Sequence, residues 1–140
     1  MNSITKRYIS WEKFADQIGT VALTKESVKQ IFDKLDKTSI IEVASDIGST
    51  IPREFLLLTY GNTSFENILS MLEIWSSRYG CVKHDIDHHH HRFSVVHGMS
   101  SKFSLFYCNL LEAMAKDLSF TSKVVTSNPQ LVSFDLFENT

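Results

Sequence analysis

The spacing of apolar residues changes near Gly80, and this change constrains the fold more than any other feature of the sequence. Upstream, apolar residues recur every three or four positions, which is the period of an amphipathic helix. Over residues 81–97 they alternate with polar residues, which is the period of a strand. We therefore expect an α+β domain in which a bundle of helices is followed by a sheet.

Five helices are predicted in the first half, each delimited by a capping residue or a glycine. They are expected over residues 10–19, 25–36, 39–48, 51–61 and 65–80. Thr24 has the position of an N-cap for the second helix, and Gly61 that of a C-terminal stop for the fourth. Thr63 and Glu66 show the spacing of a capping box before the fifth.

Two strands are predicted over residues 81–97, and together they form a hairpin. Facing their apolar sides together requires pairs such as 86 with 93 and 84 with 95. This register sets His88 opposite His91 and leaves His89 and His90 at the tip. Because a two-residue tip favours residues that accept a positive φ, a four-residue loop with the same parity is expected.

A long amphipathic helix is predicted at about residues 101–118, followed by strands at 122–126 and 130–137. The expected architecture is a single domain over residues 1–140. About five helices occupy residues 1–80. An antiparallel ββαββ sheet, with the long helix packed on it, occupies residues 81–140.

Composition limits the classes of function. The 140 residues suffice for one domain with a real core, and the net charge of −2 gives no field for non-specific binding to nucleic acid or anionic lipid. Cys81 and Cys108 are too few for a disulfide framework, so we expect reduced thiols in a cytoplasmic protein. No apolar run approaches the ~20 residues of a membrane span, and no membrane association is expected.

All six histidines lie between His84 and His97, and four of them are consecutive. Neutral imidazole binds divalent transition metals, and the candidate ligands are His84, His88, His91 and His97. The alternative is a solvated, histidine-rich loop that binds metal only adventitiously. The sequence alone leaves both interpretations open.

A second candidate site lies in the motif HGMSSKFS, where a strand ends and the long helix begins. A helix N-terminus attracts anions, so His97, Ser100, Ser101 and Lys102 could hold an anion or a ligand carbonyl. The simpler alternative is that a serine caps the helix and that His97 packs at the edge of the sheet.

Other functional motifs give little support. Residues 40–61 have the outline of a helix-turn-helix, but the would-be recognition helix offers only Arg53 to bases. The sequence contains no GxSxG elbow and no glycine-rich phosphate-binding loop, so neither nucleophilic catalysis nor nucleotide binding is indicated. We therefore expect a function without catalysis.

The segments WEKFADQIGTVALTKESVKQIFDKLD, ASDIGSTIPREFLLLTYG and HGMSSKFS together resemble a family of small uncharacterised archaeal proteins. The resemblance covers roughly residues 11–137 and is best over 48–61. Many members carry an N-terminal ribbon-helix-helix segment, which implies a transcription-associated regulatory or dimerising domain. Only ten residues precede Trp11, and Gly98 and Phe103 stand where the family has Asp and Trp. The DNA-binding arm is expected to be missing or supplied by a partner, and direct binding to nucleic acid is not expected.

These observations favour a non-enzymatic regulatory or protein-interaction domain that forms homodimers and binds a protein partner. One alternative is a sensor or enzyme that binds a divalent transition metal through the histidine cluster. Another is a sensor of small ligands, with its pocket between the long helix and the sheet.

Overall fold

The computed structural model describes Glu12 and residues 19–139. Its elements are α2 (Lys25–Lys34), α3 (Lys37–Gly48), α4 (Ile51–Tyr60), α5 (Phe65–Tyr79), β1 (Cys81–Asp87), β2 (His90–Val96), α6 (Ser101–Leu118), β3 (Phe120–Ser127) and β4 (Leu131–Glu138). The α+β class and the ββαββ order are confirmed. In the described residues four helices precede the sheet, not five. The helix predicted over 10–19 falls outside the described residues, save for Glu12 and Gly19.

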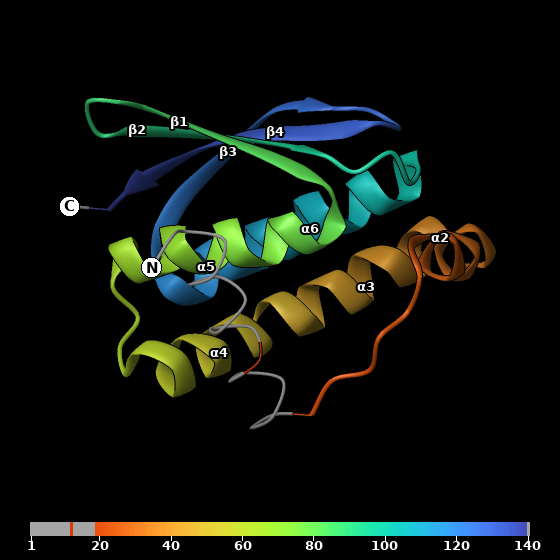
Figure 1. The fold of residues 1–140 in the computed structure, drawn as a ribbon, viewed down its shortest axis with the longest axis horizontal. Coiled ribbons are helices and arrows are strands. Elements are labelled where there is room, and N and C mark those ends of the chain that lie inside the picture. The colour runs from red at the N-terminus through yellow and green to blue at the C-terminus, as the bar shows by residue number, and fades with distance from the viewer. Residues whose placement is uncertain (1–11, 13–18, 140) are drawn as a thin grey trace.

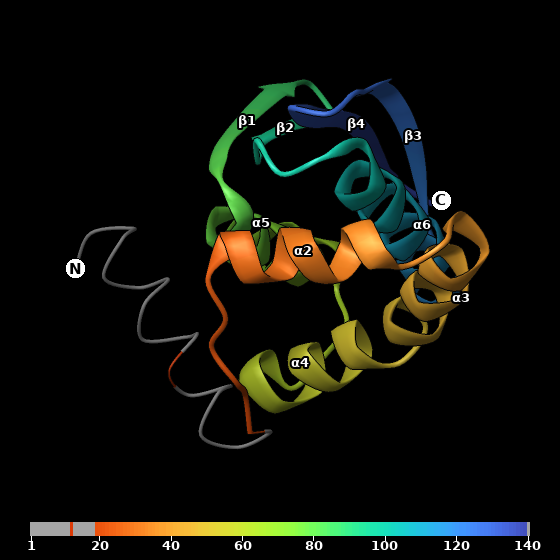
Figure 2. The same ribbon diagram turned by 90° about the vertical axis from the view of Figure 1, so that its right-hand side faces the viewer.

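The elements form three layers (Figure 1). The sheet lies on α5 and α6, and α2, α3 and α4 lie on the opposite side of these two helices (Figures 1 and 2). All described helices are therefore on one side of the sheet. None of them is long and apolar enough to cross a membrane.

The sheet is antiparallel with strand order β1-β2-β4-β3. In the hairpin His84 pairs with Phe93, and Ile86 pairs with His91. The predicted parity is confirmed, but the register is shifted by two residues from the predicted one. The predicted four-residue loop is also wrong, because Asp87 pairs with His90 and only two residues turn the chain.

Capping residues explain where the helices begin and end. The Thr24 side chain accepts a hydrogen bond from Ser27 N, and Gly61 ends α4 at φ 80, as the sequence predicts. The N-cap of α5 is Ser64, whose hydroxyl accepts from Asn67 N, so the predicted cap at Thr63 is wrong by one position. Either hydroxyl residue can cap a helix, and the sequence alone does not decide between neighbours.

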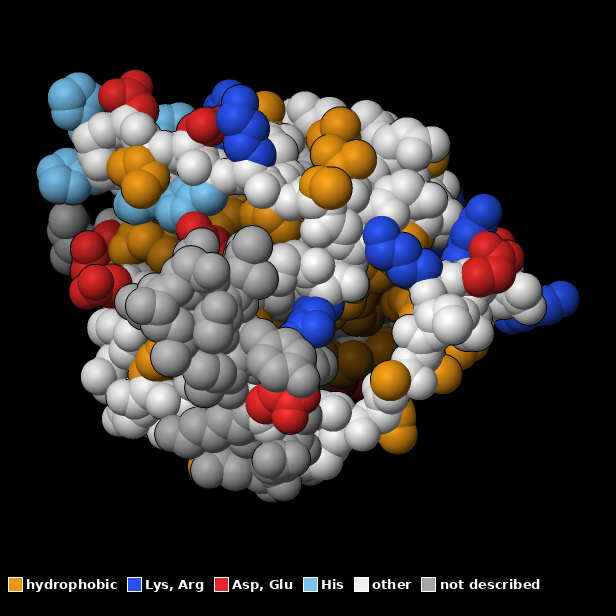
Figure 3. All heavy atoms as spheres, viewed as in Figure 1, with side chains coloured by type: hydrophobic (Ala, Val, Ile, Leu, Met, Phe, Trp, Pro, Cys, Tyr) orange, Lys and Arg blue, Asp and Glu red, His pale blue; other side chains and the backbone are white. Residues whose placement is uncertain are grey.

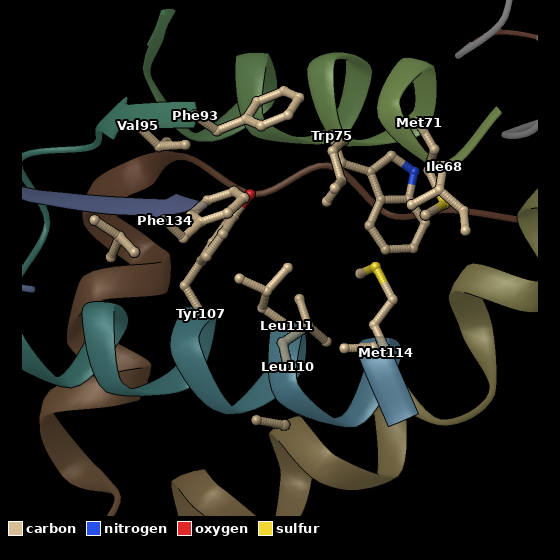
Figure 4. Packing of buried hydrophobic residues seen from close by; sticks show 14 of the residues in the cluster. Ile68, Met71, Trp75, Phe93, Val95, Tyr107, Leu110, Leu111, Met114 and Phe134 are labelled. Carbon is tan, nitrogen blue, oxygen red and sulfur yellow. The ribbon is translucent and has the colours of Figure 1, made fainter. Parts of the chain in front are cut away.

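The core lies between the sheet and the paired helices α5 and α6. Phe93 and Phe134, on the two central strands, are fully buried and stack with ring centroids 5.5 Å apart. Tyr107 of α6 reaches Phe134 from below, and Trp75 of α5 closes the core beside Met71 (Figure 4). This packing holds α5 directly beneath the hairpin, which positions the candidate site.

Candidate functional site

The hairpin carries most of the histidines, and they gather with acidic side chains at one end of the molecule (Figure 3). Alternation along β1 directs His84 toward α5, on the same face as its partner Phe93. His91 of β2 shares this face, because its partner Ile86 is two residues from His84. The helix below supplies Glu73.

These three side chains form a chain of polar contacts. Glu73 Oε1 lies 2.7 Å from His84 Nδ1, and His84 Nε2 lies 3.0 Å from His91 Nδ1. Because a carboxylate accepts hydrogen bonds, Glu73 places the proton of a neutral His84 on Nδ1. His84 Nε2 then presents its lone pair to His91.

Aromatic neighbours fix both rings. His84 stacks on Phe93, with centroids 4.1 Å apart and an angle of 16° between the planes. His91 meets Phe65 of α5 edge to face, with centroids 5.7 Å apart. The side chain of His84 is only 13% exposed, so the pair is held against the core rather than in solvent.

The surroundings of His91 lower the pKa of its imidazole ring. Burial lowers its pKa below the ordinary histidine value, and the neighbouring His84, His90 and His89 lower it further. Neutral imidazole is the form that ligates metals. The environment of His91 thus favours the ligand state over the imidazolium.

His84 Nε2 and His91 Nδ1 are 3.0 Å apart, so these two nitrogens can share one proton or bind one cation together. Zinc binds imidazole nitrogen at ~2.0–2.1 Å, so two tetrahedral ligands stand roughly 3.3 Å apart. The observed separation is within a few tenths of an ångström of that value. In the part of the chain that the structure describes, no group of three or more His, Cys, Asp or Glu side chains is placed to hold a metal. Among the residues that the structure describes, this site therefore has two ligands, not four.

The structure brings together only two of the four predicted metal ligands. The prediction that His88 lies opposite His91 is wrong. His88 lies at the hairpin tip, where its side chain is 92% exposed. It is the residue that takes the positive φ of the turn, at 57°. His97 lies six residues beyond His91 along the chain, about 20 Å at the rise of a strand. A single site made of all four is excluded.

His97 belongs to a separate buried network. Its side chain is 3% exposed, its Nδ1 accepts from Met99 N at 2.9 Å, and its Nε2 lies 2.7 Å from Ser104 Oγ. Ser104 in turn donates to Asn128 O at 2.6 Å. Every polar atom of the imidazole has a partner, which supports the packing alternative.

The predicted anion site at the start of α6 is used by the fold itself. Ser100 caps the helix by accepting from Phe103 N at 3.2 Å. Lys102 donates to the carbonyl oxygens of Asp33 at 3.0 Å and Leu35 at 2.6 Å, at the end of α2. Ser101 is exposed. The lysine thus points to a helix C-terminus, where a cation is favourable, and not to an anion.

The would-be recognition helix is also engaged within the fold. Arg53 of α4 donates through Nε to Asp117 Oδ2 at 3.1 Å and through a terminal nitrogen to Asp117 O at 2.7 Å. The only base-reading candidate of that segment is therefore tied to the end of α6. The helix-bundle interpretation accounts for these residues.

Sequence reasoning missed Glu73 and the ion pair of Arg92 with Asp135. Arg92 donates two hydrogen bonds, at 2.7 and 2.9 Å, to the Asp135 carboxylate. Alternation along β2 and β4 puts both residues on the outer face, and pairing these strands would have found them. Glu73 gave no such signal, because its contact depends on how α5 packs under the hairpin.

Comparison of the chain with protein-family models, with curated proteins and with solved structures finds no match in any of the three.

Proposed function

We propose that this chain is a non-enzymatic regulatory domain that binds one divalent transition metal between His84 and His91. The observation that carries this proposal is the 3.0 Å separation of His84 Nε2 and His91 Nδ1 on rings fixed by aromatic contacts. Binding requires His91 to carry its proton on Nε2 instead of Nδ1. The neutral ring keeps one proton in both tautomers, so no net proton release is needed.

Glu73 supports the same proposal from outside the pair. Metal-binding histidines commonly donate their second ring N–H to a carboxylate, which orients the ring and raises its basicity. The Glu73–His84 contact of 2.7 Å has this form. The metal would then couple β1, β2 and α5, since each contributes one member of the cluster.

Two protein ligands leave the remaining positions to water or to a partner molecule. Binding is therefore weaker and more reversible than at a closed structural site with four ligands. Reversible occupancy suits a regulatory domain, including the transcription-associated role that the family resemblance implies. The small-ligand alternative has less support. The cavity between α5 and α6 has a volume of only about 10 Å³. The hollow between α6 and β3, lined by Lys102 and Ser127 among others, has about 250 Å³, which is below the ~300–1,000 Å³ typical of ligand pockets.

The test is calorimetric titration of tag-free protein with Zn²⁺. We expect one ion per chain in the wild type and loss of that binding in His84→Ala and in His91→Ala. The matched control is the double variant His88→Ala/His89→Ala, which removes the tip imidazoles and leaves the pair intact. Binding that survives loss of the pair but disappears with the tip residues overturns the proposal, as does absence of binding in the wild type.

A positioning variant refines this test. Glu73→Gln keeps the size of the side chain but removes its charge, and loss of such a support typically lowers metal affinity by about 10–100-fold. We expect weaker binding at unchanged stoichiometry. An affinity equal to that of the wild type would show that Glu73 does not orient a metal ligand.

A further inference from the structure

The outer face of the sheet carries a row of charges that crosses all four strands. Asp85 pairs with Arg92, Arg92 pairs with Asp135, and Asp135 pairs with Lys123. In the strand order β1-β2-β4-β3 the row reads negative, positive, negative, positive. The described helices all lie on the other side of the sheet, so none of them covers this row.

An alternating row of even length is complementary to itself. Consider a two-fold axis that lies in the interface between two copies, parallel to the strands and between β2 and β4. This axis reverses the order of the row in the second copy. It sets Asp85 against Lys123 of the partner subunit and Arg92 against Asp135 of the partner subunit. Every facing pair then has opposite charges, whereas an axis along the row would set like charges together.

The outer-face residues on either side of the charged row are also compatible with this two-fold axis. It sets Ser94 against Ser133 of the partner subunit, and these serines already lie side by side in one chain, with hydroxyl oxygens 3.1 Å apart. It also sets His90 against Phe137 of the partner subunit. These two rings already stack within one chain, with centroids 5.1 Å apart. Val96 pairs with Leu131 in the chain, so the next facing contact is apolar.

Exposure and area are suited to a modest interface. Asp135 is buried within the single chain, with only 6% of its surface exposed. Val96 is 49% and Phe137 38% exposed, so packing of a second copy on this face would bury new apolar surface. Four strands ~4.8 Å apart and about seven residues long give a flat face of roughly 450 Å². This is at the small end for a stable pair, which indicates a weak and salt-sensitive dimer.

We propose that this outer sheet face is the interface of a homodimer in which two copies pack sheet against sheet, with Asp85 of each copy facing Lys123 of the other. Sheets that pack face to face align within about 30°. The long lysine side chain spans the offset that this angle produces at the end of the row. The inference does not depend on metal binding.

The test is sedimentation velocity over a range of protein and salt concentrations. We expect a monomer–dimer equilibrium in the wild type that shifts to monomer as salt rises. Lys123→Glu or Asp85→Lys alone creates two like-charge contacts per dimer and should raise the dimer Kd by about tenfold or more. The double variant Asp85→Lys/Lys123→Glu restores opposite charges across the interface and should recover the dimer.

Lys37→Glu is the matched control, because it makes the same charge change on an exposed residue of α3, which lies on the other side of the sheet from the outer face. It should leave the dimer unchanged, and circular dichroism checks that each variant folds. A wild type that stays monomeric at every concentration overturns the proposal. So does a dimer that neither single reversal weakens, or a double variant that is no better than the singles.

Discussion

His97 Nε2 lies 2.7 Å from Ser104 Oγ, and this contact ties the end of β2 to the first turn of α6. Because Met99 N donates to Nδ1, the ring proton is on Nε2 and is donated to Ser104. The Ser104 hydroxyl in turn donates a hydrogen bond to Asn128 O, which joins the β3–β4 turn to the same point. One neutral histidine thus connects three segments.

Ser104→Ala should destabilise the fold. It leaves the buried Nε2–H of His97 and the carbonyl of Asn128 without this partner, at a cost of about 1–3 kcal/mol. Urea unfolding at neutral pH measures the change. A loss within about 0.5 kcal/mol, as for an ordinary surface substitution, would contradict the network.

His97 should also make stability depend on pH. Burial lowers its pKa below 6.5, and nearby Lys25 lowers it further. The unfolded chain therefore takes up the proton first, so the stabilising contribution is complete above 6.5 and is lost as the pH falls below it. In His97→Gln, whose amide keeps a donor, unfolding free energy measured across this range should fall less steeply. An equally steep fall would contradict the assignment.

Much of this fold follows from local signals in the sequence. The glycine after α4 and the hydroxyl before α2 mark helix ends at Gly61 and Thr24, because each satisfies backbone groups by itself. The hairpin register was harder. Parity follows from which face is apolar, but the length of the turn depends on whether His88 accepts φ 57, and the general preference for Asn or Gly argues against it.

Gly48→Ala should push α3 away from α6. An added Cβ would lie 2.5 Å from the backbone oxygen of Leu110 and 2.9 Å from the Cβ of Ala113. Because a backbone oxygen cannot move away by a side-chain rotation, we expect the free energy of unfolding to fall by about 1–3 kcal/mol. Thermal or urea unfolding measures this change. Glu42→Ala, on an exposed position of the same helix, is the control and should change little. Equal stability of the two variants would refute the close approach.

His88→Asn should stabilise the hairpin. His88 is exposed and takes a positive φ, a conformation that asparagine adopts at lower cost. We expect a gain of up to about 1 kcal/mol in unfolding free energy. His89→Asn, at the other turn position, is the control and should be close to neutral. The turn would be wrongly assigned if the control gained as much.

The site was less predictable than the fold. Counting histidines pointed to the hairpin, but it grouped His97 with residues about 20 Å away along the strand. The pair that does meet, His84 and His91, is diagonal across the hairpin and depends on the true register. Its third member, Glu73, comes from α5, and no local sequence pattern predicts how this helix packs under the hairpin.

Metal binding by the His84–His91 pair is tested most directly by following imidazole nitrogens in long-range ¹H–¹⁵N spectra while tag-free protein is titrated with Zn²⁺. We predict that His84 Nε2 and His91 Nδ1 shift together and saturate at one ion per chain, while the ring nitrogens of His97 and the tip residue His88 keep their positions. Shifts that begin at His88 or His89, with the His84–His91 signals unchanged, would contradict a metal site at this pair.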